Sequence, residues 1–213
     1  MASALTANSR VLDLGCGRGG IVERLGPQGA GGEQTARWAG VDPDISSLWE
    51  HRSGNLRRAC ANAEELPFSS GTFDIVIASW VLEHLPRPAA TFREIARVMR
   101  RGGSFFFLTP NATHPLPRLS AAIAPLHRFQ QRIVAHFYGR GAADTFPVTY
   151  RANTVGAISR LSVRVGLRPV EIAWVDDPSY FACDQMTFML AVMAELLLPP
   201  TWQVHIVGHL QKR

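Results

Sequence analysis

Residues 11–20 read Val-Leu-Asp-Leu-Gly-Cys-Gly-Arg-Gly-Gly, an apolar segment that runs directly into a glycine-rich loop. The apolar residues before Gly15 suit a buried parallel strand. Gly15 and Gly17 leave room for a ligand to lie against bare backbone before a helix begins. This stretch therefore predicts a binding site at the end of the first strand for a small molecule that carries a carboxylate or a phosphate.

The composition limits the class of protein. At 213 residues and 46% hydrophobic content, the chain can bury one sizeable core, so we expect a single domain over residues 1–213. Its three cysteines are too few for a disulfide framework, and no Cys/His cluster predicts a metal. No segment resembles a secretory leader, and no apolar run reaches the ~18 residues of a spanning helix. A cytoplasmic location is expected.

The net charge of +5 raises the question of an anionic partner. The basic residues are spread along the chain, and no motif of an RNA-binding module is present. We therefore expect them to be solvated surface and expect no nucleic-acid partner. The oligomeric state cannot be predicted from this pattern.

Beyond the glycine loop, segments typical of strands alternate with segments typical of helices, as in a doubly wound α/β sheet. A helix is predicted after Asp44 as its cap, and another after Asn153 or Thr154 through Val165. Strands are expected near residues 10–14, 37–42, 56–61, 73–79, 103–109, 168–175 and 202–210.

Three further features complete the predicted organisation. Thr91-x-x-Glu94 resembles a capping box, and Gly102-Gly103 is expected to end the helix that this box begins. Residues 110–150 and 176–201 interrupt the alternation. We interpret them as helical insertions after the fifth and sixth strands that form the acceptor site, with residues 10–110 as the cofactor-binding half.

The spacing Gly15-x-Gly17-x-x-Gly20 also satisfies the dinucleotide fingerprint, so the ligand must be decided by context. Asp13 lies two residues before the first glycine. A carboxylate there would repel the pyrophosphate of a nicotinamide cofactor, because the two carry like charges. A zwitterion with an ammonium and a sulfonium would find the same charge favourable, and its own carboxylate would face the loop amides. S-adenosylmethionine is such a ligand.

The ends of the next two strands supply the rest of a nucleoside site. The second strand ends Gly40-Val41-Asp42-Pro43, and the Asp42 carboxylate can accept from both hydroxyls of a ribose. The third ends near Asn62, whose amide oxygen can accept from an adenine amino group. The backbone N–H of Ala63 can donate to a ring nitrogen.

At this point the chain resembles the class I S-adenosylmethionine-dependent methyltransferases, in particular the small-molecule branch that includes ubiquinone and menaquinone biosynthesis enzymes. The resemblance covers about residues 10–110 and is carried by Val11–Gly17, Gly40–Asp42, Asn62–Phe68, Phe73–Val76, Val81–Leu85 and Arg100–Gly103. It implies a Rossmann-like seven-stranded sheet whose last strand is antiparallel. Many relatives carry aspartate where Asn62 stands.

The resemblance also implies the roles of single residues. Asp13, Gly15 and Gly17 would surround the methionine part, and the turn at Ser79-Trp80 would close over the sulfonium. Cys16 is expected mainly to fill space in the loop. The predicted cofactor-binding set is Asp13, Gly15, Cys16, Gly17, Asp42, Pro43, Asn62, Ala63, Ser79 and Trp80.

Two histidines are candidates for a catalytic base. His84 follows the fourth strand near the expected position of the methyl group, and a histidine can remove a proton at neutral pH. The interpretation that His84 only binds loop backbone and supports the site is favoured. His114 lies just past the fifth strand, on the edge where acceptors bind in this fold, and is a rival candidate.

The acceptor itself has no motif. The apolar stretch 186–198 is too short to span a bilayer and is most simply core, although a lipid-like substrate or peripheral membrane contact is an alternative. The leading hypothesis is methyl transfer to oxygen, nitrogen or carbon of a small-molecule acceptor. A non-catalytic cofactor-binding partner module and a dinucleotide-dependent oxidoreductase are the alternatives.

Overall fold

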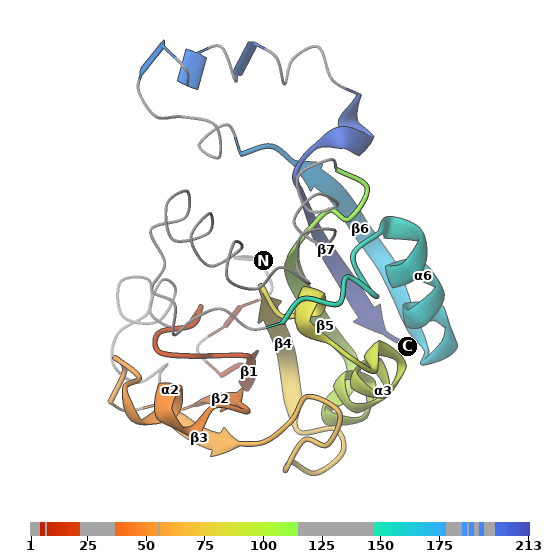
Figure 1. The fold of residues 1–213 in the computed structure, drawn as a ribbon. Helices are drawn as coiled ribbons and strands as arrows, with labels where there is room; N and C mark the ends of the chain where they lie inside the picture. Colours follow the sequence, from red (N-terminus) through yellow and green to blue (C-terminus); the bar gives the residue numbers. More distant parts are fainter. Residues whose placement is uncertain are drawn as a thin grey trace.

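A computed structural model describes residues 5–6, 8–21, 37–54, 56–114, 147–177, 185–186, 188–189, 192–193 and 199–213. These residues form an α/β fold with strands, α-helices and short 3-10 helices (Figure 1). The strands are β1 (Val11–Leu14), β2 (Trp38–Asp42), β3 (Arg57–Cys60), β4 (Phe73–Ser79), β5 (Met99–Pro110), β6 (Leu167–Val175) and β7 (His205–Lys212). The helices are α2 (Ile45–Trp49), α3 (Pro88–Val98), α6 (Val155–Arg164), η3 (Leu82–His84) and η6 (Pro200–Trp202).

All seven strands belong to one sheet in the order β3-β2-β1-β4-β5-β7-β6. The five strands from β1 to β5 pair in parallel, whereas β7 runs antiparallel to both β5 and β6. The order reverses at β1, so the loops after β1 and β4 leave the same edge of the sheet in opposite directions. Ligands bind at such a switch point in open α/β sheets. The predicted sheet with an antiparallel last strand is confirmed.

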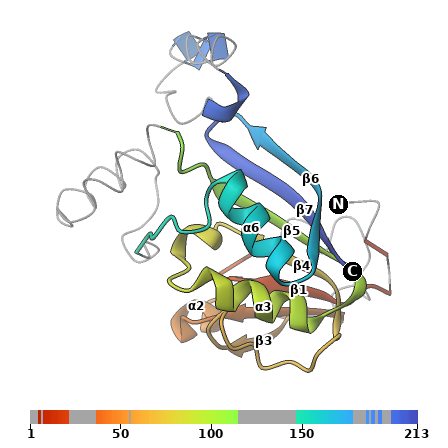
Figure 2. The same cartoon turned by 90° about the vertical axis from the view of Figure 1, so that its right-hand side faces the viewer.

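Side-chain alternation along the central strands builds a core on each face of the sheet. Leu12 and Val76 contribute to the larger core cluster, and Val11 and Ile75 to the smaller one. Figures 1 and 2 show α3 and α6 side by side over one face. There the fully buried Phe92 of α3 meets Phe105 of β5 edge to face, with ring centroids 6.0 Å apart.

Two of the predicted helix caps are confirmed. The Asp44 carboxylate accepts hydrogen bonds from the backbone N–H groups of Ser46 and Ser47 at the start of α2. The Thr154 hydroxyl accepts from the N–H of Ala157 at the start of α6. Both caps depend on residues within three positions of each other, which is why the local sequence identifies them.

The predicted capping box is wrong. Helix α3 begins at Pro88, which suits the first turn because its missing N–H has no partner there anyway. Thr91 is therefore buried inside the helix, and Glu94 pairs with Arg97. The helix also ends earlier than expected, at Val98, and Gly102 lies within β5 with φ +74°.

Most of both predicted insertions, residues 115–146 and most of 178–198, lies outside the described residues. Their assignment to the acceptor site stays a prediction. Within the described part of the chain, no helix combines the length and apolar character that a bilayer crossing requires.

Candidate cofactor site and acceptor face

The glycine loop folds back over the end of β2. The N–H groups of Gly15 and Cys16 both donate to the carbonyl of Val41, at 2.7 and 3.1 Å. Gly15 has φ +74°, and a Cβ there would lie 2.4 Å from Cγ2 of Val81, so no larger residue fits. Gly17 also has a positive φ, +49°, but a Cβ there would meet no atom of the described residues within 4 Å. The loop thus offers bare backbone to open space above Gly17.

Asp42 lies directly beside this open backbone. Its Oδ2 accepts from the N–H of Gly17 at 2.9 Å, and its Oδ1 accepts from the N–H of Asp44 at the same distance. Each carboxylate oxygen can accept two hydrogen bonds, so both retain capacity for a hydroxyl donor. The exposed Pro43 follows at the rim, where its carbonyl accepts from the thiol of Cys60.

Asp13 is placed differently from the expectation that its carboxylate faces the ligand. It is only 1% exposed, and its Oδ2 accepts from the N–H of Ile21 at 2.9 Å. A Cβ on Gly20 would lie 2.1 Å from the same oxygen. The carboxylate therefore lies inside the loop and maintains its shape, because the backbone amide of Ile21 provides a partner that a buried charge requires.

The loop after β3 approaches the same place. The N–H of Ala61 donates to the backbone carbonyl of Asp42 at 3.2 Å, and Glu65 closes a turn onto the carbonyl of Asn62. The side chain of Asn62 is exposed and forms no hydrogen bond to any residue that the structure describes. Ala63 is half-buried next to it. The loop that carries the exposed amide of Asn62 is therefore fixed to the end of β2 through the backbone of Asp42.

Cys16 has the space-filling role that the sequence indicated. It is buried, and a Cβ on Gly40 would lie 2.7 Å from its sulfur. Burial, with the nearby charges of Asp13 and Asp42, raises the pKa of the Cys16 thiol to about 12. The thiol is protonated at neutral pH and is not a nucleophile.

The turn after β4 carries a strained residue. Trp80 has φ +61°, which is uncommon for a residue with a bulky side chain. Its N–H donates to the carbonyl of Leu108 at 2.9 Å, in continuation of the pairing of Ser79 with Leu108. The indole meets the imidazole of His205 edge to face, with centroids 4.8 Å apart. Val81 then places its side chain over Gly15.

His84 binds backbone, as the favoured interpretation expected. Its Nδ1 lies 2.9 Å from the carbonyl oxygen of Pro147. A carbonyl only accepts, so Nδ1 carries the proton in this contact. The other nitrogen, Nε2, lies 3.8 Å from Oε1 of Glu83. This geometry supports the loop after β4.

Glu83 anchors that loop through a buried polar network that the sequence analysis missed. The hydroxyl of Thr109 donates to Glu83 Oε2 at 3.1 Å, and Nδ2 of Asn153 donates to that hydroxyl at 2.5 Å. All three residues are at most 4% exposed. They come from η3, β5 and the approach to α6, so the network joins the loop after β4 to segments far apart in the sequence.

His114 and His205 are two buried histidines at the carboxyl edge of the parallel strands. Burial lowers the pKa of both imidazoles, and the proximity of His114 lowers the pKa of His205 further. Asp176 raises the pKa of His114 and Asp177 that of His205, each to a smaller extent than burial lowers it, and the effect of Asp177 on His205 is larger than that of His114. Both histidines are therefore neutral at pH 7. The sequence analysis missed His205, although its position at the start of the antiparallel last strand signalled this edge.

The structure thus gathers most of the predicted residues around one edge. Asp42 accepts from the open backbone at Gly17, and the loop that carries Asn62 is hydrogen-bonded to the backbone of Asp42. Trp80 lies at the turn after β4, next to His205. No group of three or more His, Cys, Asp or Glu side chains that could hold a metal occurs within the described ranges.

Comparison with known proteins agrees with the family that the sequence motifs resemble. Residues 12–107 match a family model described as a methyltransferase domain. The chain is 34% identical over 160 residues to a ubiquinone biosynthesis O-methyltransferase of Pseudomonas aeruginosa, covering 72% of this chain and 63% of the relative. It is 30% identical over 146 residues to a fatty-acid O-methyltransferase of Mycolicibacterium smegmatis, covering 66% and 52%. The chain thus spans between half and two thirds of these relatives.

Solved structures share the fold. A methyltransferase from Methanosarcina mazei superimposes with a TM-score of 0.65 at 16% identity, over 99% of this chain and 95% of the other. A geranyl diphosphate C-methyltransferase from Streptomyces coelicolor, solved with S-adenosyl-L-homocysteine, superimposes with a TM-score of 0.62 at 15% identity, over 97% and 72%. At these identities the likeness concerns the fold alone.

Proposed function

We propose that this chain is a class I S-adenosylmethionine-dependent methyltransferase that transfers a methyl group from that cofactor to a small-molecule acceptor. One observation carries the proposal. The backbone at Gly17 faces open space beside a carboxylate, Asp42, that has spare acceptor capacity at the switch point of the sheet.

The residues present fit the proposed cofactor. Asp42 would accept from the ribose hydroxyls while it keeps its bonds to Gly17 and Asp44. Asn62 and the N–H of Ala63 would read the adenine edge. The glycine loop would receive the methionine carboxylate, and Asp13 would act through the loop shape that it maintains. When bound, the cofactor supplies a methyl group that its sulfonium already makes electrophilic.

The protein therefore has mainly to position the acceptor and exclude water. Alignment of two reactants in this way can contribute ~7–11 kcal/mol to lowering the barrier. The rigid turn at Trp80, fixed by its bond to Leu108, would form one wall of the acceptor site. Proton removal is needed only when the acceptor is protonated, and the neutral imidazole of His114 or His205 could then accept that proton.

We propose an apolar acceptor. The relatives named for ubiquinone biosynthesis and for fatty acids support an apolar class. The described pieces of the segment 185–193 add exposed apolar side chains, with Met186 and Met193 each more than 60% exposed. A single domain and a cytoplasmic location remain part of this proposal.

Isothermal titration of the purified chain with S-adenosylhomocysteine tests the cofactor. We expect one molecule bound per chain and no heat with NADH under the same conditions. Incubation with methyl-labelled S-adenosylmethionine and a panel of phenols, fatty acids and sterols then tests transfer and acceptor class. Well-folded protein that binds NADH and ignores S-adenosylhomocysteine would refute the proposal.

A further inference from the structure

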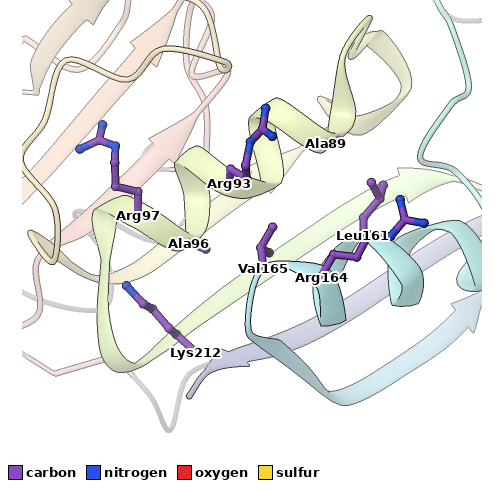
Figure 3. A pocket seen from close by; sticks show the side chains of 8 residues that line it. All are labelled: Ala89, Arg93, Ala96, Arg97, Leu161, Arg164, Val165 and Lys212. Atoms are coloured by element: carbon purple, nitrogen blue, oxygen red, sulfur yellow. The ribbon is translucent and has the colours of Figure 1, made fainter.

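A groove of about 530 Å³ lies between α3, α6 and the end of β7 (Figure 3). It is at the opposite edge of the sheet from the glycine loop. Lys212, which lines it, pairs with Leu167 at the start of β6, whereas His205 pairs with Val175 at the other end of the same two strands. The groove therefore belongs to neither the cofactor site nor the acceptor face.

The lining of the groove combines an apolar floor with basic side chains. Its apolar members are small or aliphatic, and none of the described residues that line it is acidic. Lys212 is the only lysine in the chain. The lining residues are Ala89, Ala96, Leu161 and Val165, together with Arg93, Arg97, Arg164 and Lys212.

Two of the four cations are already engaged. Arg97 donates to Glu94 and to the carbonyl of Phe68, and Lys212 Nζ donates to the carbonyl of Met99 at 2.7 Å. Arg93 and Arg164 are exposed, and neither forms a hydrogen bond or ion pair with a residue that the structure describes. One free guanidinium on each helix is therefore available to a ligand.

The negative C-terminal ends of the two helices do not neutralise all four positive charges of the groove. Both α3 and α6 end at the groove, and each helix C-terminus carries about half a negative charge. Glu94 adds one full negative charge beside Arg97. These contributions offset about two of the four positive charges. An excess of about two remains, and the apolar floor concentrates its field.

We propose that this groove is a second binding site, for a ligand that carries a phosphate or diphosphate group. A guanidinium binds phosphate oxygens in a bidentate manner, and Arg93 and Arg164 supply one from each wall. The apolar floor would contact the carbon atoms next to the phosphate. The ligand is either a soluble phosphate ester or a phospholipid headgroup, which share this chemistry.

The single lysine allows a site-specific test. The full chain is acylated with limiting acetic anhydride in phosphate-free buffer, with and without inorganic pyrophosphate, and acylation of Lys212 is followed by peptide mass spectrometry. Pyrophosphate should slow acylation of Lys212 at least threefold, with the N-terminal amine as the internal reference. Vesicles of phosphatidylcholine with and without phosphatidic acid form the second arm and distinguish the source of the phosphate.

Arg164→Ala and Arg160→Ala provide matched variants. Arg160 lies one turn before Arg164 on α6 and is also exposed, but it folds back toward Gly156 and does not line the groove. Arg164→Ala should weaken pyrophosphate or vesicle binding about tenfold, the effect of losing a charge-assisted hydrogen bond. Arg160→Ala should change it less than twofold.

The site is supported if pyrophosphate or phosphatidic acid vesicles protect Lys212 from acylation and Arg164→Ala weakens this binding more than Arg160→Ala. Absence of protection in both arms overturns it, and so does equal weakening by both variants, which would indicate diffuse surface charge. Binding of S-adenosylhomocysteine should be unchanged in both variants. Failure of this proposal is thereby separable from failure of the proposed function.

Discussion

Gly17→Ala should separate ligand binding from folding. Among the residues that the structure describes, the new methyl group would meet no atom within 4 Å, so its cost to them comes from the φ of +49°. A left-handed conformation costs a residue with a Cβ about 1–2 kcal/mol. For a domain of this size, that corresponds to a decrease in Tm of about 2–8 °C.

The effect on the cofactor should be larger. If the ligand lies against Gly17, the added methyl overlaps it, and overpacking of this kind costs about 1–3 kcal/mol. The Kd for S-adenosylhomocysteine should therefore rise about 5- to 150-fold. Isothermal titration measures the affinity, and thermal unfolding followed by circular dichroism measures the stability.

Gly102→Ala is the matched control. Gly102 has φ +74°, and a Cβ there also meets no atom within 4 Å in the described part of the chain, but it lies near the start of β5, at the far edge of the sheet. It should lower the Tm by a similar amount and leave the affinity within twofold of the wild type. A folded Gly17→Ala variant that binds S-adenosylhomocysteine as tightly as the wild type would refute the placement of the ligand over this loop.

Three further predictions concern the site and its support. Asp42→Asn should raise the Kd for S-adenosylhomocysteine about tenfold or more, because an amide nitrogen cannot accept a hydrogen bond from a ribose hydroxyl. Asp44→Asn keeps a good helix cap and should leave that Kd unchanged. Equal effects of the two variants in calorimetry would argue against the ribose role of Asp42. Burial lowers the pKa of His114 and His205, so at acidic pH the unfolded chain takes up protons that the folded chain does not. The free energy of unfolding, measured in urea, should therefore fall from pH 7.5 to 5.5, and it should fall less in His205→Gln. A rise in this free energy would contradict the burial of these rings. Arg97→Lys should lower the free energy of unfolding by about 1.5–3 kcal/mol, because it breaks the guanidinium hydrogen bonds that join α3 to the carbonyls of Leu66 and Phe68 before β4. An unchanged urea midpoint would show that these hydrogen bonds do not stabilise the fold.

Short-range features were predicted well, and the errors have local explanations. Asp44 and Thr154 cap their helices because their partners lie two or three residues away. Thr91 and Glu94 carry the same local pattern but lie inside α3, since Pro88 begins the helix one turn earlier. The sequence contained that signal, and the proline should have outweighed the box.

Residues whose partners are distant in the chain were harder to place. Asp13 was assigned to the ligand from its charge, yet its carboxylate bonds to the backbone of Ile21. The network of Glu83 with Thr109 and Asn153 spans up to 70 residues of sequence and has no local pattern. Such contacts depend on which strand edges meet, and that is decided only when the sheet has formed.

The amino-acid sequence alone determined the α/β sheet class and the position of the glycine loop, because periodicity and turn chemistry are encoded within a few neighbouring residues. The antiparallel last strand was implied by the resemblance of its motifs to the methyltransferase family. Only the tertiary structure decided that His205 faces Trp80 across the carboxyl edge, and that basic residues of α3, α6 and β7 share one groove. The reason is physical. Packing joins segments more than a hundred residues apart, such as Ser104 and Gln211, and their register is fixed by the burial of both faces of the sheet together.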